Sequence, residues 1–334
     1  MTFIWRWFGL AACLFLLVLP QFTNPYIQYM VNLVLVYVIL GIGLNFLLGY
    51  AGQFAFAHAA LMGIGAYTTA IVTYRLGLSY WLALPLSGIT AMIVGSLGAL
   101  PAMRMKRVYL ALVTLAFAEL LHWVFVHWKP VTAGTDGMSV RSPEFFGYSL
   151  RGDDNTFYVL LVILIFLYII ARRIVESRIG RSFVAIRENE IVAQSCGISV
   201  GRTKALVFAL SAFYAGIGGS MFALTLGYIV PDSFNLFQLV VHFSIVVIGG
   251  LISIYGSIIG AVILTALPEL LRDFQALQEI IYGVLLMVFI IFMPSGIAGV
   301  AKRIGILPDE ILSRNWRRLK TAPGRQPQSD DGKA

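Results

Sequence analysis

The chain has 334 residues, of which 59% are hydrophobic and 12% are charged. An average soluble domain is roughly 45–50% apolar and about 25% charged, so the composition excludes a water-soluble globular protein. The net charge of +8 suits nucleic acid in a soluble protein, but in a membrane protein basic residues first indicate topology. We therefore expect an all-α polytopic membrane protein without a nucleic-acid partner.

Apolar runs in chain order predict about ten transmembrane helices. Their positions are near 4–20, 27–48, 54–74, 81–101, 108–127, 156–171, 205–228, 238–254, 256–271 and 280–297. The first run lacks a small-residue cleavage site before Pro20, so we interpret it as a retained span rather than a signal peptide. Residues 238–271 are too long for one span, and Gly249-Gly250 with the turn-like 253–256 predicts a break between two short helices.

The basic residues predict that both termini are cytoplasmic. With ten spans and the N-terminus inside, 19 of the 24 Lys and Arg fall in inside segments, as the positive-inside rule requires. Residues 1–300 then form a transmembrane domain with a cytoplasmic loop at 172–204 and an outside loop at 128–155. Residues 301–334 form a basic cytoplasmic tail, whose Pro- and Gly-containing polar end is expected to be disordered.

Small residues at helical spacing predict close helix packing, because contacts between membrane helices favour side chains that let backbones approach. Three such stripes are expected: Ala51, Ala55, Ala59 and Gly63; Gly216, Gly219 and Ala223; Gly256 and Gly260.

The chain offers little for catalysis or metal binding. Its two cysteines, Cys13 and Cys196, cannot form a disulfide framework or a metal cluster. The four histidines lie in three spans without neighbouring carboxylate clusters. Neither a GxxxxGK[ST] phosphate loop nor a nucleophile motif is present. We expect no catalytic residues, no metal and no cofactor in this chain.

Polar residues inside spans are costly in hydrocarbon, so they usually face a bundle interior or a pathway. The candidates are Asn45, Gln53, His58, Thr68, Thr69, Glu119, His122, His127 and His242. Glu119 and His122 are three residues apart, hence on one helix face, where they could share a proton. This allows two interpretations, a proton-coupled carrier or hydrogen bonds that only hold helices together.

A charged segment at 181–204 interrupts the apolar pattern. Asn189 is a favourable N-cap, Glu190 follows at the positive end of the helix dipole, and Gly197 suits the left-handed residue after a helix end. The two turns between them are too short to be stable alone. A partner must therefore cover the apolar residues, and it is either a protein or anionic lipid attracted by arginines 172, 173, 178, 181 and 187.

Four blocks of the sequence resemble the permease subunits of branched-chain amino-acid ABC importers of the LivM type. They are GLNFLLGYAGQFAFAHAALMGIGAYTTA at 43–70, TAGTDGM at 132–138, AIRENEIVAQSCGISVGRTKALVFALSAFYAGIGGSMFA at 185–223 and GGLISIYGSIIGAVILTALPELL at 249–271. The resemblance implies a location in the bacterial inner membrane and a heterodimer with a second, homologous permease. It also implies two cytoplasmic ATPase subunits, which bind ATP and Mg, and a periplasmic substrate-binding protein.

The resemblance also assigns roles to residues. It implies that 187–197 is the coupling helix, which relays ATPase closure to the spans through Arg187, Glu188, Asn189, Glu190, Ala193 and Gly197. The importer pattern Glu-Ala-Ala with Gly four residues later falls on Ile191, Val192, Ala193 and Gly197, so only its last two positions match and Glu190 stands one residue early.

The same resemblance implies alternating-access import of branched-chain or related amino acids. Related permeases also carry urea, short amides or aromatic carboxylates, and a self-contained proton-coupled carrier centred on Glu119 and His122 is a second alternative. Asn45, Gln53 and His58, together with Glu119 and His122, are expected along the translocation pathway. Thr135 and Asp136 of TAGTDGM are expected to face the binding protein, although this loop could equally be a solvated connection.

Overall fold

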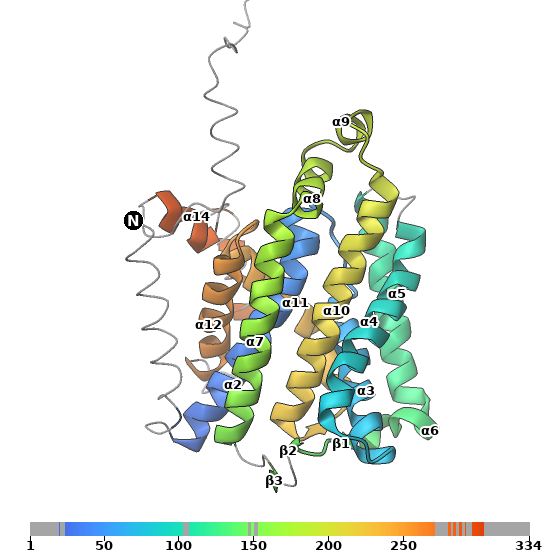
Figure 1. Ribbon diagram of the computed structural model, residues 1–334, viewed down its shortest axis with the longest axis vertical. Coiled ribbons are helices and arrows are strands. Elements are labelled where there is room, and N and C mark those ends of the chain that lie inside the picture. Colours follow the sequence, from blue (N-terminus) through green and yellow to red (C-terminus); the bar gives the residue numbers. More distant parts are fainter. Residues whose placement is uncertain are drawn as a thin grey trace, which may run out of the picture.

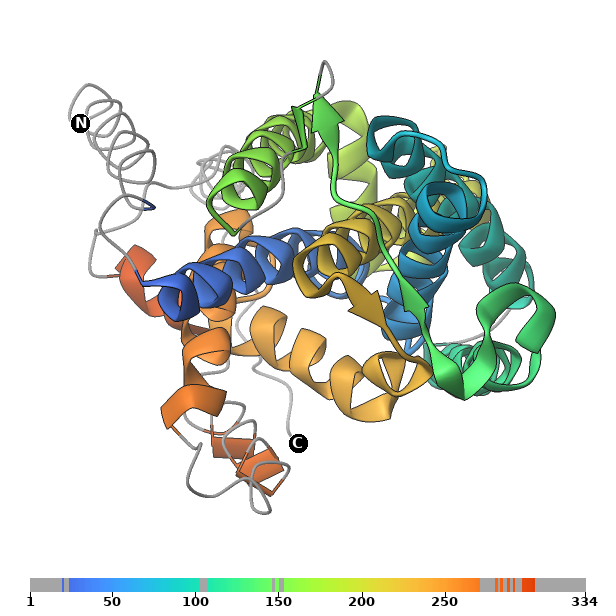
Figure 2. The same cartoon turned by 90° about the horizontal axis from the view of Figure 1, so that it is seen from below.

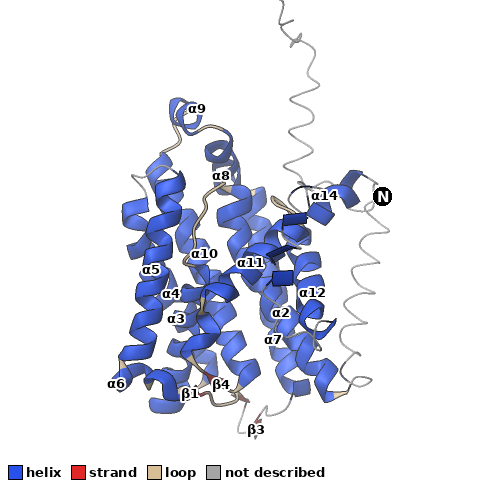
Figure 3. Cartoon of the chain, turned by 180° about the vertical axis from the view of Figure 1, so that it is seen from behind, coloured by secondary structure: helices blue, strands red, loops and turns tan. Residues whose placement is uncertain are grey.

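The computed structural model describes residues 20, 24–102, 107–145, 148–149 and 153–270, with 280–281, 283–284, 287–288, 291 and 296–303. Within them the chain is a bundle of long helices, with short strands only at one end (Figures 1 and 3). The short helix α9 (Glu190–Ser195) lies at the opposite end. We call the two ends the α9 end and the strand end.

Eight membrane-type helices form the bundle. They are α2 (Pro25–Asn45), α3 (His58–Ala70), α4 (Tyr80–Ala102), α5 (Arg107–His127), α7 (Asp153–Glu176), α10 (Val200–Leu226), α11 (Leu236–Gly249) and α12 (Ile254–Leu270). The π-helical turns η2 (Phe46–Tyr50) and η3 (Ile71–Arg75) extend α2 and α3. Six of these eight helices, all but α3 and α12, are long and apolar enough to cross a membrane. The chain is a polytopic membrane protein.

The centre of the bundle is built from α2, α3 and α10, around which the other helices are arranged (Figure 2). In the most apolar window of each helix, 78% of α2 and 72% of α10 is buried, against 28% of α4 and 22% of α5. The peripheral helices therefore present most of their apolar side chains outward.

Glycines allow the central helices to touch. A Cβ at Gly219 of α10 would lie 1.9 Å from the carbonyl oxygen of Met62 on α3, and one at Gly65 would lie 2.1 Å from that of Gly216. Gly249 of α11 meets Gly256 of α12 in the same way, at 2.0 Å. The two stripes expected on α10 and α12 are thus confirmed as close backbone contacts.

The expected stripe at 51–63 is wrong as a single helix face. Residues 51–57 are not helical, and α3 begins only at His58, so Ala59 and Gly63 alone share a helix. Gly52 has φ +63°, a left-handed backbone conformation that ends the preceding helical run. Non-helical backbone at membrane depth is tolerated where it is surrounded by protein, and most of this segment is buried.

The break expected within 238–271 is confirmed. α11 ends at Gly249, α12 begins at Ile254, and Gly250 has φ +124°. The predicted first span at 4–20, apart from residue 20, and the predicted tail at 301–334, apart from residues 301–303, lie outside the described residues, as does much of the predicted last span. At its end the described chain includes α14 (Gly296–Arg303).

Candidate functional site

α9 is capped at both ends. The side-chain Oδ1 of Asn189 accepts hydrogen bonds from the backbone N–H of Ile191 at 2.9 Å and of Val192 at 3.2 Å. Gly197, at φ +83°, turns the chain away after the last turn. Both features match the sequence prediction, and together they define a helix of only six residues that follows α8 (Arg178–Glu188).

An ion pair fixes α9 to the bundle. Lys204 Nζ, near the start of α10, lies 2.9 Å from both carboxylate oxygens of Glu190. The Lys204 side chain is only 4% exposed, so this contact is shielded from solvent on the lysine side. Glu190 therefore forms an ion pair within this chain. This contact gives a structural role to the acidic residue that stands one position before the start of the importer pattern at Ile191.

The apolar side chains of α9 separate into two groups. Ala193 is buried against the rest of the chain, whereas Ile191 is 79% and Val192 57% exposed. The expectation that one partner covers all three residues is thus wrong for Ala193. The two exposed residues, Ile191 and Val192, are β-branched and apolar. The Glu190–Lys204 ion pair holds their helix against α10. Such a pair offers an apolar surface to another molecule or to lipid.

Arg187 and Glu188 belong to the end of α8, and not to the short helix as the sequence suggested. The guanidinium Nη1 of Arg187 donates a 2.6 Å hydrogen bond to the carbonyl oxygen of Gly49 in η2. A Cβ at Gly52 would lie 2.8 Å from the Arg187 side chain, so the two segments are in close contact. Arg187 therefore ties the α8–α9 segment to the end of α2.

Asn45, at the end of α2, binds the break between α11 and α12. Its Nδ2 donates to the carbonyl oxygen of Ser253 at 2.8 Å and to Ser257 Oγ at 2.9 Å, while the N–H of Ile252 donates to its Oδ1 at 3.2 Å. Ile252 has φ +60°, a strained conformation for a β-branched residue. The amide of Asn45 supplies hydrogen bonds to this strained turn.

A buried polar chain crosses the bundle interior from α2 to α3 through α11. Nδ1 of His58 lies 3.3 Å from Nδ1 of His242, so one ring donates to the other. On the far side of His242, Gln238 Nε2 lies 3.3 Å from its Nε2 and donates to Tyr37 Oη at 3.1 Å. His58 Nε2 is buried without a partner among the described residues. The His58–His242 and Gln238–Tyr37 contacts join α11 to α3 and to α2, so they fix the register of these three helices.

Gln53 lies apart from this network, in the non-helical segment 51–57. Its Nε2 donates to the carbonyl oxygen of Ala51 at 3.3 Å, and its buried Oε1 has no partner among the described residues. The side chains of Asn45, Gln53 and His58 thus form hydrogen bonds in three different parts of the structure. Their role along a pathway stays a prediction, and Asn45 in particular makes the interhelical bonds that hold helices together.

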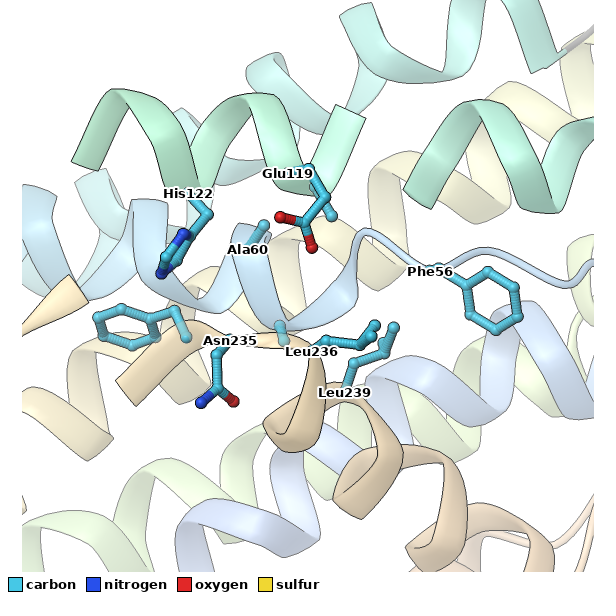
Figure 4. Close-up of a pocket in the computed structure, with 10 residues that line it drawn as sticks. Phe56, Ala60, Glu119, His122, Asn235, Leu236 and Leu239 are labelled. Carbon is cyan, nitrogen blue, oxygen red and sulfur yellow. The ribbon is translucent and has the colours of Figure 1, made fainter. Parts of the chain in front are cut away.

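Glu119 and His122 do share one face of α5, and both line a cavity of about 210 Å³ (Figure 4). The cavity lies between α5, the start of α3 and the start of α11, whose Ala60, Leu236 and Leu239 form part of its wall. Figure 4 shows the Glu119 carboxylate and the His122 ring pointing from α5 toward the first turn of α3. No hydrogen bond joins the two side chains in the described part of the chain.

The TAGTDGM loop is ordered at the strand end. After α6 (Lys129–Thr132), a 3-10 turn η4 spans Gly134–Asp136, and β1 (Met138–Ser139) pairs antiparallel with β4 (Tyr228–Ile229). Thr132 Oγ1 donates to the carbonyl oxygen of Phe125 on α5 at 2.9 Å, and the Tyr228 hydroxyl donates to that of Asp136. Thr135 and Asp136 remain exposed at the tip. A second strand pair, β2 (Glu144–Phe145) with β3 (Tyr148–Ser149), follows.

Among the residues that the structure describes, no three His, Cys, Asp or Glu side chains are grouped so that they could hold a metal ion.

Comparison with known proteins identifies the family. A family model described as "Branched-chain amino acid transport system / permease component" matches residues 26–293. The chain belongs to this permease family. Members are non-catalytic subunits of ABC transporters, which accords with the expectation that the chain is not an enzyme. No solved structure gives a significant match.

Three curated relatives show the breadth of this similarity. The permease is 32% identical to the high-affinity branched-chain amino acid transport system permease protein LivM of Escherichia coli, over 80% of this chain and 68% of the relative. It is 25% identical to LivH of Salmonella typhimurium, over 79% and 91% of the two chains. It is also 25% identical to the ribose import permease protein RbsC of Haemophilus influenzae, over 70% and 73%.

Several contact residues of the permease were missed from the sequence. Lys204 binds Glu190, 14 positions earlier, and Gln238 binds His242, four positions later, while Tyr37 is reached by Gln238 from 201 positions away. For Lys204 the sequence did offer a signal, because a basic residue at the start of an apolar span is costly to bury unless it pairs with an acidic group. Gln238 gave no such signal, since it stands at the start of a predicted span, and Tyr37, in the middle of the span 27–48, was not considered among the polar residues of the spans.

Proposed function

We propose that the chain is one of two permease subunits of an ATP-driven importer of branched-chain or related amino acids. In this proposal the α9 end faces the cytoplasm, both termini lie on that side, and the protein resides in the bacterial inner membrane. Two ATPase subunits bind ATP and Mg and dock at α9, and a periplasmic binding protein delivers substrate at the strand end. A second, homologous permease completes the pathway.

The observation that carries this proposal is the outward apolar pair of α9. Ile191 and Val192 are the exposed face of a helix that Asn189 caps and that the Glu190–Lys204 pair fixes to α10. A helix anchored in this way can transmit force, because it moves with α10 rather than swinging on a flexible loop. An apolar groove on an ATPase subunit would cover the pair.

Two contacts support transmission from α9 into the bundle. Arg187 binds Gly49 at the end of α2, and Asn45, one turn earlier, binds the turn between α11 and α12. A displacement of the α8–α9 segment would thus reach a strained turn between two helices. Such a turn suits an element with two discrete arrangements.

At the other end, Thr135 and Asp136 support docking of the binding protein. They are exposed at the tip of a turn that is fixed to α5 and to the end of α10. The basic residues near α9 would at the same time contact anionic lipid. The self-contained proton carrier gains no support, because the family consists of subunits of ABC transporters.

Reconstitution tests the proposal. The chain is co-expressed with the permease and ATPase subunits encoded beside it, purified as a complex and placed in proteoliposomes with the loaded binding protein. We expect leucine uptake that requires both ATP and the binding protein. Uptake by the isolated chain under a pH gradient, without ATPase subunits, would contradict the proposal.

A further inference from the structure

Glu119 is the starting point, because its place in the membrane is unusual. It lies near the middle of α5, and in the isolated chain it is exposed. In the described part of the protein it has no hydrogen-bond or ion-pair partner. An ionisable group inside a membrane faces a pathway or pairs with another charge, because contact with lipid is costly. Glu119 therefore either faces a pathway or pairs with a group outside the described residues.

The cavity beside Glu119 indicates what that partner is. It provides a second polar group, since His122 lies one turn further along α5 and its Nε2 is buried without a partner. On a helix, residues three apart have Cβ atoms roughly 5–6 Å from one another. A carboxylate and an imidazole at this separation can contact the two adjacent polar groups of one small molecule.

Apart from Asn235, the rest of the cavity wall is apolar. Leu236 and Leu239 of α11 lie across from Ala60 of α3, with Phe56 at one end (Figure 4). A cavity of about 150 Å³ lined by apolar side chains can hold benzene. The cavity here, at about 210 Å³, has room for an aliphatic side chain together with a charged head.

We propose that this cavity binds an α-amino acid with an apolar side chain, and that the Glu119 carboxylate holds its ammonium group. His122 donates to the ligand's carboxylate, and the α3 and α11 side chains cover its aliphatic part. The second permease subunit closes the open side of the cavity. This inference rests on the proposed import function and names the group that selects the substrate. Aromatic carboxylates, which have no ammonium group, are repelled by Glu119, and uncharged urea and amides gain no ion pair.

Protection of an introduced thiol tests the site directly. In the full transporter complex, Cys13 and Cys196 are replaced by alanine and Leu239→Cys is introduced as the reactive group. The rate at which a small thiol reagent modifies Leu239→Cys is measured with leucine, with 3-methylbutylamine, which lacks the carboxylate, and with 4-methylpentanoate, which lacks the ammonium group. We expect leucine and the amine to slow modification, and 4-methylpentanoate to leave it unchanged.

Removal of the charge should remove the selectivity. A hydrogen bond to a charged group corresponds to roughly ten- to a hundredfold in affinity. Glu119→Gln should therefore raise the leucine concentration needed for protection by about that factor, and Glu119→Asp should recover part of the loss. Glu176→Gln is the matched control, because Glu176 is an acidic residue of another span that pairs with Arg172 on the surface. The leucine concentration needed to protect the Glu176→Gln variant should equal that of the parent protein.

The outcomes separate the site from the function. Equal protection by leucine and 4-methylpentanoate, or protection unchanged in Glu119→Gln, would overturn the cavity assignment. If the parent complex imports leucine in the same preparation, the proposed function stands without this site. A parent complex that neither binds ATPase subunits nor imports leucine would overturn both.

Discussion

At the α9 end, the apolar side chains of Ile191 and Val192 face outward and an ion pair lies between α9 and α10, whereas in the bundle interior polar side chains are enclosed by apolar ones. Glu190 and Lys204 pair under α9 while Ile191 and Val192 are exposed. In the interior, His58 and His242 pair at the centre of an apolar core. An anchored helix with an apolar exterior is suited to bind a partner. A buried polar chain fixes helices relative to one another, so variants in the two regions should fail in different ways.

The largest effect is expected from the central helix contact. Gly219→Ala would place a methyl group 1.9 Å from the Met62 carbonyl oxygen, so α3 and α10 must move apart. Overpacking costs about 1–3 kcal/mol, and we expect the upper end here because backbone atoms must shift. Thermal unfolding of the purified protein measures the loss. Gly283→Ala, where nothing lies within 4 Å, is the control. Equal stability of both variants would contradict the close packing.

A smaller loss is expected from Asn45→Leu. The change removes three hydrogen bonds to the α11–α12 turn and the start of α12, and it takes the Asn45 acceptor from the Ile252 N–H, while the Ser253 carbonyl oxygen keeps its bond from the Ser257 N–H. An unsatisfied buried group costs about 1–3 kcal/mol, so we predict a loss of about 2 kcal/mol in unfolding free energy. Hydrogen exchange at 250–257 should also rise. If exchange rises equally over the whole bundle, Asn45 does not act on this turn.

A still smaller loss is expected at the base of α9. Lys204→Met keeps the length of the side chain and removes the ion pair with Glu190. Because Glu190 is partly exposed and can be solvated, the cost should be about 1 kcal/mol or less. Import should nevertheless fall several-fold, since α9 loses its connection to α10. The charge exchange Glu190→Lys with Lys204→Glu should restore import, and failure of the exchange with normal folding would argue against this connection.

The sequence predicted well what depends on neighbouring residues. The Asn189 cap, the left-handed Gly197 and the break after Gly249 are each determined within a few positions, because capping and turn chemistry act locally. The helices followed from hydrophobic run length for the same reason.

Contacts between distant segments could not be predicted in this way. The pairing of His58 with His242, 184 positions later, depends on how three helices pack. The assumption of a continuous helix from 54 also failed, because the apolar composition did not reveal that residues 51–57 are not helical. Glu119 and His122 were placed on one face by spacing alone, but only the fold brings α3 and α11 opposite them.

The most direct test of the account is the association of ATPase subunits with an Ile191→Asp variant. Ile191 is 79% exposed, so the change should leave the unfolding temperature of this chain unaltered. Ala193→Asp is a poorer choice, since Ala193 is buried and the variant would also disturb the attachment of α9. Gln194→Asp, an exposed position of the same helix on a different face from the apolar pair, is the control. We predict that Ile191→Asp copurifies without ATPase subunits and imports nothing, while Gln194→Asp retains both. Normal ATPase association in Ile191→Asp would contradict the assignment of α9 as the coupling helix.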